Sequence, residues 1–465
     1  MKKYSKGSFK LLLLLLLLLG NSIVAGAEES GQIEALKIPT IKVVTETGED
    51  PTYDVVGHPA GCMGSSITNN NYVACDVKYY DSTEEVIVDE TAKIKVRGNT
   101  SAYYAKKGFT LKFEKKKTFD FCEGKGNKKW ILLSCGTNLR YLMSNMASEF
   151  CGMEWQPQFQ YVNLEVNGDY RGCYVLAQAA DTMVKELNFD NSGFMIETDA
   201  YWWNADVYFK TAYQQVALGY TFKSPDTEDL TEQRIADTKD YMEQLLVELN
   251  KDTSDYLDYI DVNSFASWFL AKDYLQSIDV YGSNTYYYRK SSDSKLQMGP
   301  TWDYDGDYGG NINEWAATHT NINLNYSEKL FWRSDFKKAY RNQFEKHRDI
   351  YEKLKEASDT YLAKYADSLS ESWVKDCERW GTKTSTNVYG VRNLILDRYQ
   401  TRIAWIDEQT KNWSLDFSDY YEAVEEASSY NPDDYENGNI LQELLDIDVY
   451  DISVTQEELD KITEN

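Results

Sequence analysis

The chain has 465 residues and a formal net charge of −26 at pH 7, with 42% hydrophobic and 14% aromatic residues. This hydrophobic content can build a full core, whereas the acidity argues against binding to nucleic acid or to anionic membranes, because both demand basic patches. With only three His residues, a His-dependent triad or a zinc hydrolase is disfavoured, and acid–base chemistry falls to carboxylates.

The N-terminal segment has the pattern of a secretory signal peptide. Lysines precede an unbroken leucine run at 11–19, and Ala25-Gly26-Ala27 is typical of a cleavage site. We therefore expect residues 1–27 to be a signal peptide, residues 28–37 to be a flexible leader, and the mature protein to be secreted and extracellular. No later apolar stretch is long enough for a membrane span.

From Ile38 to about residue 225 the pattern is rich in strands. Alternating apolar runs are separated by Gly, Asn and Ser clusters, and Asn167-Gly168 predicts a hairpin turn between two of them. One helix is expected at 139–150, from the spacing of its apolar residues. The predicted strands are 41–44, 72–77, 85–88, 94–96, 109–113, 129–133, 161–166, 172–176, 194–197 and 220–223.

After Pro225 the pattern changes to helices. Thr231 is suited to cap the first of them, a second is expected near 263–275, and several more are expected between 330 and 407. Residues 411–465 are rich in acids and nearly free of Lys and Arg, which indicates an acidic tail appended to the fold.

This order of elements predicts an α+β fold with two lobes. The strand-rich N-terminal lobe is expected at about 38–225 and the helical C-terminal lobe at about 226–410. A binding site is expected at the junction of the lobes, because sites favour such junctions.

The acids at this junction have the spacing of a phosphoryl-transfer site. Asp279 and Asn284 form D-x-x-x-x-N, the interval at which a kinase catalytic loop presents a base and a metal ligand. After a predicted hairpin come Asp303 and Asp305, whose carboxylates suit metals that bridge phosphates. Asp279 would then deprotonate a hydroxyl, and Asn284 would bind Mg²⁺ through its amide oxygen. The spacing also arises by chance, so it does not establish catalysis alone.

A structural calcium site is an alternative reading of the same acids. Asp303, Asp305, Asp307 and Glu314 occupy positions 1, 3, 5 and 12 of an EF-hand loop. Position 6, however, is Tyr308 and not the required Gly, and the flanking segments do not resemble two helices. The pattern therefore disfavours a true EF-hand and leaves an irregular Ca²⁺ site open.

Two further polar segments have both a functional and a structural interpretation. The turn 97–101 (Arg-Gly-Asn-Thr-Ser) and the lysines after it combine backbone N–H groups, hydroxyls and cations that suit phosphates, but a solvated polar hairpin has the same composition. Glu197 and Asp199 at a strand end could act as a glycoside-hydrolysing pair, with Trp202 and Trp203 beside them to stack on sugar.

In this order the motifs resemble the CotH family of atypical protein kinases, over roughly residues 38–407. The resemblance implies a kinase-like two-lobed fold, and an enzyme that uses ATP with Mg²⁺ or Mn²⁺ to transfer the γ-phosphate to Ser or Thr of proteins. The motifs that carry the resemblance are 97–101, 106–109, 129–132, 166–172, 223–226, 279–284 and 299–305.

The resemblance also implies roles for individual residues. Asp279 corresponds to the catalytic base, and Asn284 together with Asp303 or Asp305 to the metal ligands. Lys107, with Lys112 as second choice, corresponds to the lysine that contacts phosphate. The nucleotide-binding set is Arg97, Gly98, Ser101, Lys107 and Lys112.

Departures from the family pattern support a second hypothesis. The family often has Glu where this chain has Gln178, and an Arg-Asn pair where it has Ser144-Asn145. An exported protein also meets little ATP. The alternative is therefore a non-catalytic cell-surface or adhesion protein on a kinase-like fold, binding carbohydrate or calcium, with an extracellular surface partner in place of a protein substrate.

Overall fold

The computed structural model describes residues 36–59, 62, 66–67, 71–124, 126–211, 218–251, 253–277, 283–304, 307–308, 315, 327–383 and 385–412. The chain divides into two compact units between Ala35 and Leu36, and every described residue belongs to the second unit. Among these residues, no helix has both the length and the apolar character needed to cross a membrane.

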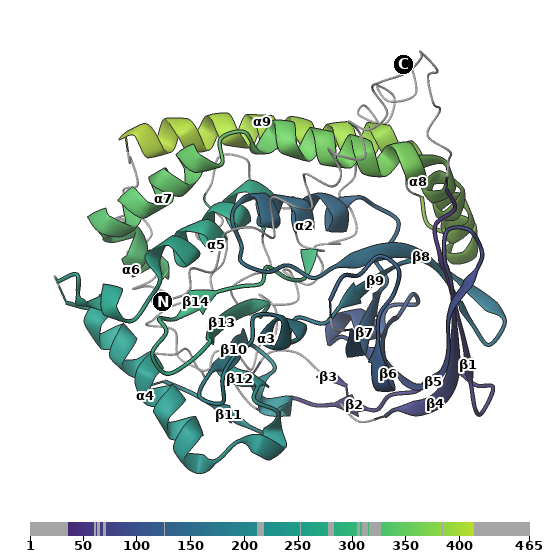
Figure 1. The fold of residues 1–465 in the computed structure, drawn as a ribbon, viewed down its shortest axis with the longest axis horizontal. Helices are drawn as coiled ribbons and strands as arrows, with labels where there is room; N and C mark the ends of the chain where they lie inside the picture. The colour runs from purple at the N-terminus through teal and green to yellow at the C-terminus, as the bar shows by residue number, and fades with distance from the viewer. Residues whose placement is uncertain are drawn as a thin grey trace, which may run out of the picture. The chain divides into compact units, whose positions relative to one another are not determined.

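Seven strands close into a barrel (Figure 1). Neighbouring strands are antiparallel except at the closure, where β1 runs parallel to β8. Alternate residues such as Ile94, Leu111 and Trp130 fill the interior. In barrel order the strands are β1 (Thr40–Thr45), β4 (Val73–Tyr80), β5 (Val86–Arg97), β6 (Gly108–Lys117), β7 (Asn127–Leu133), β9 (Asp169–Gln178) and β8 (Phe159–Val166).

A second sheet of five strands has β10 at its centre. β10 pairs antiparallel with β12 and β13 and sets Glu197 opposite Thr221 and Tyr286. The β13–β14 hairpin is the one predicted between the two acidic segments. In order the strands are β11 (Tyr208–Phe209), β12 (Gly219–Ser224), β10 (Phe194–Asp199), β13 (Thr285–Arg289) and β14 (Gln297–Met298), while β2 (Val55–Val56) pairs separately with β3 (Ser66–Ile67).

The longer helices lie mostly after residue 230. The prediction that Thr231 caps a helix is confirmed, because its hydroxyl accepts the N–H of Arg234 at 3.2 Å. The next long helix, α5, is buried and leads towards the acidic segment. The helices are α2 (Arg140–Phe150), α3 (Thr182–Glu186), α4 (Glu232–Leu249), α5 (Val262–Leu275), α6 (Ser327–Trp332), α7 (Ser334–Lys346), α8 (Ile350–Trp380) and α9 (Val388–Asn412).

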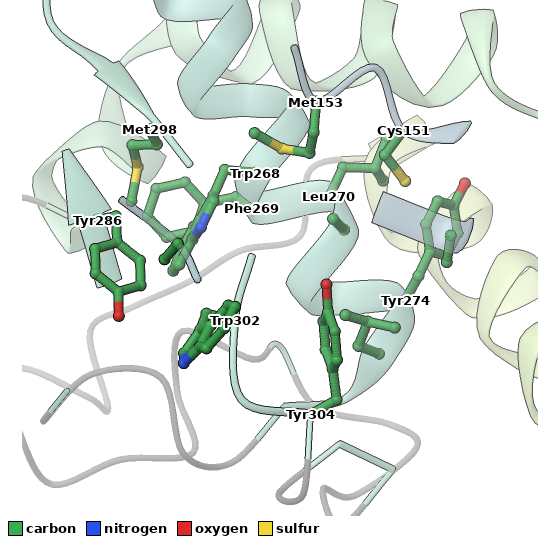
Figure 2. Packing of buried hydrophobic residues seen from close by; sticks show 14 of the residues in the cluster. Cys151, Met153, Trp268, Phe269, Leu270, Tyr274, Tyr286, Met298, Trp302 and Tyr304 are labelled. Atoms are coloured by element: carbon green, nitrogen blue, oxygen red, sulfur yellow. The ribbon is translucent and has the colours of Figure 1, made fainter. Parts of the chain in front are cut away.

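One hydrophobic core joins the outer face of the barrel to the second sheet and the helices. Ile131 of β7 and Val175 of β9 belong to the same buried cluster as Ile196 of β10 and Leu270 of α5. Figure 2 shows part of this cluster, in which side chains of α5 meet Trp302 from the loop that follows β14. The barrel is therefore packed against the rest of the molecule through a shared core.

The expected kinase-like two-lobed fold is wrong. Strands that were expected to form an N-terminal lobe divide between the closed barrel and the second sheet, and that sheet also takes β13 and β14 from beyond residue 226. The shared core leaves no boundary between a strand lobe and a helical lobe. The mixture of helices and strands remains, but its architecture is a seven-strand barrel with a second sheet and helices.

Candidate functional site

The central strand of the second sheet carries two carboxylates next to a lysine. Glu197 and Asp199 are two residues apart on β10 and so project from the same face. Lys223, from β12, places its Nζ 2.5 Å from Glu197 Oε2 and 4.0 Å from Asp199 Oδ2. Only 9% of the Glu197 side chain and 30% of the Lys223 side chain are exposed, so the ion pair is largely withdrawn from water.

The electrostatics of this trio favour a charged lysine. Burial raises the pKa of Glu197, and the charge of Lys223 opposes that rise. Burial also acts to lower the pKa of Lys223, but Glu197 and Asp199 outweigh it, and the pKa of Lys223 lies above its usual value. Asp199 accepts hydrogen bonds from the Thr221 hydroxyl at 3.1 Å and the Tyr201 N–H at 2.7 Å. Lys223 is therefore held as a cation between two carboxylates.

Glu197 also forms a hydrogen bond to the backbone of Asn284, the residue whose side-chain amide was predicted to bind a metal. Its Oε1 accepts the backbone N–H of Asn284 at 2.8 Å. Asn284 has a φ of +63°, in the left-handed region, and is 8% exposed. The preceding residue, Ser283, accepts the N–H of Ala200 through its hydroxyl at 3.3 Å. The end of the Asp279–Asn284 motif is thus fastened to the end of β10.

Arg97 and Asp303 reach the same region from two other elements. The pKa of the Tyr286 hydroxyl is raised by burial and by Glu197, Asp199 and Asp303, while Arg97 opposes the rise. Asp303 itself has a φ of +54°. Positive φ costs energy in a non-glycine residue, and such residues cluster at functional sites. Charges from the barrel, from β10 and from the loop after β14 therefore all act on the Tyr286 hydroxyl.

The residues predicted to bind a nucleotide differ in what they contact. Arg97, Gly98 and Ser101 belong to one turn, whereas the Lys107 side chain is bound to backbone carbonyls. Arg97 ends β5 beside Gly98, which has a φ of +100°, and a Cβ added to Gly98 would lie 2.1 Å from the Ser101 hydroxyl. Lys107, in contrast, donates to the carbonyls of Ala102 at 2.9 Å and Tyr104 at 3.0 Å. Lys107 therefore fastens the turn that carries Ser101.

Lys112 lies on the outer face of the barrel. It is exposed, and its Nζ is 5.9 Å from the centroid of the Tyr72 ring. Lys95 lies over the same ring at 5.1 Å. Burial, together with the neighbouring charges of Lys129, Arg97 and Lys112, lowers the pKa of Lys95 to about 8. The outer face of β5, β6 and β7 is therefore a concentrated cationic surface beside the acids.

Two of the predicted residues, Asp279 and Asp305, lie outside the described residues, as does Glu314 of the calcium pattern. Within the described part of the chain, no group of three or more His, Cys, Asp or Glu side chains is arranged to hold a metal ion. The metal ligands Asn284, Asp303 and Asp305 therefore remain predictions, and so does the calcium alternative.

Asp307, the third acid of the calcium pattern, is committed to the end of α5. The Ser277 hydroxyl donates to its Oδ1, and the following residue, Tyr308, donates its N–H to the Leu275 carbonyl at 2.6 Å. Asp307 is 1% exposed. Burial raises its pKa to about 6, although Lys272 and Ser277 oppose the rise. The carboxylate therefore anchors the loop that follows Asp303.

The departures from the family pattern have local explanations. The Gln178 amide donates to Glu186 Oε1 at 2.9 Å and its oxygen accepts the Gln158 N–H at 2.9 Å. A Glu at position 178 would place its carboxylate against that of Glu186. Ser144 donates to the Tyr308 hydroxyl at 3.2 Å. Both residues are therefore bound within the fold.

Sequence reasoning assigned no phosphate-site role to Lys95, Lys129 or Asp181. Lys129 is paired with Asp181, and the charge of Asp181 also contributes to raising the pKa values of Tyr72 and Lys223. Asp181 is thus paired with the cationic surface, and its charge also acts on the acid–lysine trio. The signal that points to these lysines is cross-strand register, which becomes visible only once the strand pairing is known.

The fold and the site define a mixed helix–strand protein in which a cationic barrel surface adjoins a buried carboxylate–lysine cluster. Residues 94–406 match the family model described as CotH kinase protein. Because the match covers most of the chain, the protein belongs to the CotH family, as the motif order indicated. A comparison with curated proteins found no match.

Proposed function

We propose that this CotH-family chain is an exported protein kinase that uses ATP and a divalent metal to phosphorylate Ser or Thr of proteins. Family membership supports a kinase-like role, and the signal-peptide pattern supports export. The observation that carries the proposal is that Glu197, paired with Lys223, lies opposite Tyr286 on the neighbouring strand, and that the charges of Arg97 and Asp303 act on the same Tyr286 hydroxyl. This arrangement supports a site that combines a cation for phosphates with oxygen ligands for a metal.

The donor set suits a metal–nucleotide complex. Mg²⁺ and Mn²⁺ prefer oxygen ligands, which Asn284 and Asp303 offer from two neighbouring segments in left-handed backbone conformations. Glu197 holds the backbone of Asn284, so the Lys223–Glu197 pair supports a proposed ligand without being one. A bound metal would supply positive charge to neutralise the phosphates.

The other predicted site residues would contact the phosphates or take up the proton of the acceptor hydroxyl. Arg97 and Lys112 would face phosphate oxygens, and Ser101 with the Gly98 turn would offer hydroxyl and N–H donors. Asp279 would accept the proton of the acceptor hydroxyl as that oxygen forms its bond to the γ-phosphorus, while the bond from the γ-phosphorus to the β–γ bridging oxygen breaks and ADP leaves. Such a base contributes typically about 10²–10⁴-fold to the rate.

The test is transfer of labelled γ-phosphate from ATP, in the presence of Mn²⁺ or Mg²⁺, to the protein itself or to an added acidic protein. We expect D279N to lower incorporation by at least about 100-fold. The matched control is D293N, which changes an exposed aspartate in the β13–β14 turn and should leave incorporation unchanged.

Thermal melting of D279N and D293N would first establish that both variants are folded. Incorporation by folded D279N at the wild-type level would refute Asp279 as the base. The absence of both transfer and nucleotide binding in the wild-type protein would refute the kinase proposal and favour the non-catalytic alternative.

A further inference from the structure

Three lysines form a row across three neighbouring strands of the barrel. Lys93 of β5 pairs with Lys112 of β6, and Lys112 pairs with Lys129 of β7. Directly opposed residues project from the same face of a sheet. The next position in the same register is occupied by Ile94, Leu111 and Trp130, which fill the barrel interior. The three lysines, called here the lysine row, therefore point outward.

The lysine row is poorly neutralised. Lys129 has a carboxylate partner in Asp181. Neither Lys93 nor Lys112 forms an ion pair with any residue in the described ranges, and both are exposed. Lys95 lies two residues along β5 from Lys93, with Tyr72 over it. Of the three lysines in the row, Lys129 alone is thus paired with an acid among the described residues.

Repulsion between the opposed lysines destabilises the fold, although the chain has many acidic residues that could have neutralised them. Like charges directly opposite each other on neighbouring strands are destabilising. The pKa of Lys95 is lowered chiefly by burial, and the charges of Lys129, Arg97 and Lys112 add to that lowering. The chain has 75 acidic residues against 49 basic ones. A concentration of unneutralised cations in so acidic a protein points to an anionic ligand.

The length of the lysine row and the net charge of the protein favour a short acidic peptide as the anionic ligand. Neighbouring strands are about 4.8 Å apart, so the row extends about 10 Å across the sheet, and acidic side chains on one side of an extended peptide recur about every 7 Å. An extended peptide with two or three acids therefore fits the row. A net charge of −26 repels a membrane or a nucleic acid, whereas a short peptide feels mainly the charges within about 10 Å.

We propose that the two outer lysines of the row, Lys93 and Lys129, bind an acidic stretch of the protein substrate and bring the substrate's neighbouring Ser or Thr to the site around Tyr286, while Lys112 between them faces the nucleotide. The row leads there, because Arg97 lies two residues beyond Lys95 on β5 and acts on Tyr286. This inference rests on the proposed function for the identity of the ligand as a substrate. The surface itself follows from strand register and charge alone.

The test is direct binding of a fluorescent peptide of alternating Glu and Ser residues, followed by polarisation at low salt. The variant K93S/K129S removes the two outer lysines and spares Lys112, which is a predicted nucleotide contact. The matched control is K115S/K116S, which removes two exposed lysines from the far end of β6 and causes the same change in net charge. ATP binding with Mn²⁺ is measured on the same proteins by thermal shift.

We expect K93S/K129S to bind the peptide about tenfold more weakly, and K115S/K116S less than twofold more weakly, because exposed ion pairs contribute modestly and locally. Nucleotide binding should be unchanged in both variants. A loss of nucleotide binding in K93S/K129S would overturn the inference by assigning the row to the phosphates. Equal peptide affinity in the two variants would overturn it as well. Because no turnover is needed, these outcomes are separate from the failure of the kinase assay.

Discussion

Asp307 shows how one buried carboxylate couples loop geometry to protonation. It is 1% exposed, and it accepts a hydrogen bond from the hydroxyl of Ser277. Its other oxygen, Oδ2, has no hydrogen-bond partner within the described part of the chain. An ionised carboxylate with an unsatisfied oxygen is costly in a buried site. The loop after Asp303 is therefore anchored by a group whose charge opposes folding.

This residue predicts a specific dependence of stability on pH. The pKa of Asp307 is raised from 3.8 to about 6 in the folded protein, so between these values the folded state binds more protons than the unfolded state. Stability from this group consequently falls as pH rises from about 4 to 6, by on the order of 2–3 kcal/mol. We expect D307N to be more stable than wild type at pH 7 by an amount of this order and equal to it near pH 4.

Urea unfolding at pH 4 and pH 7 measures both differences. Asn keeps an oxygen that can accept from Ser277, so the variant removes the charge without removing this contact. A D307N protein that is less stable than wild type at pH 7 would contradict the assignment.

Among the elements, α8 is fastened to the barrel by several contacts, of which the one made by the buried acid Asp376 is the closest to β9. Asp376 Oδ2 accepts from Lys106 Nζ at 2.5 Å and from the Cys173 N–H at 2.7 Å. The Trp373 indole donates to the Gly136 carbonyl at 2.8 Å one turn earlier on the helix. A buried acid with two charged or polar donors is costly to disturb, because each donor is left without its partner. The helix thus depends on close approach to β9.

The close approach of Asp376 to β9 occurs at Gly172, and comparison of Gly172 with Gly168 gives a prediction. A Cβ at Gly172 would lie 2.0 Å from Asp376 Oδ2, whereas a Cβ at Gly168, in the preceding turn, meets nothing within 4 Å. Both glycines have positive φ, so alanine costs about 1–2 kcal/mol at either position. We expect G172A to lose at least about 3 kcal/mol in free energy of unfolding and G168A to lose only the smaller amount.

Urea unfolding curves of the two variants give the comparison, with G168A as the control for backbone strain. Equal losses would mean that α8 yields to the added methyl group without cost.

At the scale of the whole molecule, the large net negative charge opposes the binding of a nucleotide. The formal charge of −26 disfavours an anionic nucleotide at long range, so binding depends on the local cations and on a metal. We expect ATP with Mn²⁺ at about 100 times its Kd to stabilise the native state by about 2.7 kcal/mol, which raises Tm by about 5 °C. ATP without a divalent metal should have a much smaller effect.

Differential scanning fluorimetry of D303N checks the proposed metal ligand in this experiment. The variant should lose most of the shift, while D293N should keep it. A full shift in D303N would remove Asp303 from the ligand set.

The sequence predicted the individual elements well and their assembly poorly. The alternating run at 109–113 falls within β6, the run at 72–77 begins one residue before β4, and the predicted helix near 263–275 is α5. The segments 85–88 and 94–96, expected as two strands, form the single strand β5. Barrel closure joins residues 40–43 to 163–166, and pairing over such a separation leaves no local pattern from which it could be predicted.

The candidate site depends on the same long-range strand pairing, so the sequence could indicate single residues of the site but not their partners. Arg97 and Lys112 were expected to act together, and strand pairing does place both on one surface of the barrel. Lys107 instead bonds to its own turn, a local contact that composition cannot distinguish from phosphate binding. Glu197 was considered only as part of a hydrolase pair, because its partner Lys223 comes from another strand. Whether Asp279 acts as the base stays a prediction.

The closed barrel also affects how molecules of this protein meet one another. A closed sheet has no edge strand at which a second chain can add by backbone hydrogen bonding. In the described part of the molecule, the edges of the second sheet are β11 and β14, and each is two residues long. Edges of that length offer too few free N–H and C=O groups to template a further strand. A strand-rich chain is thereby protected from intermolecular β-sheet growth by its topology.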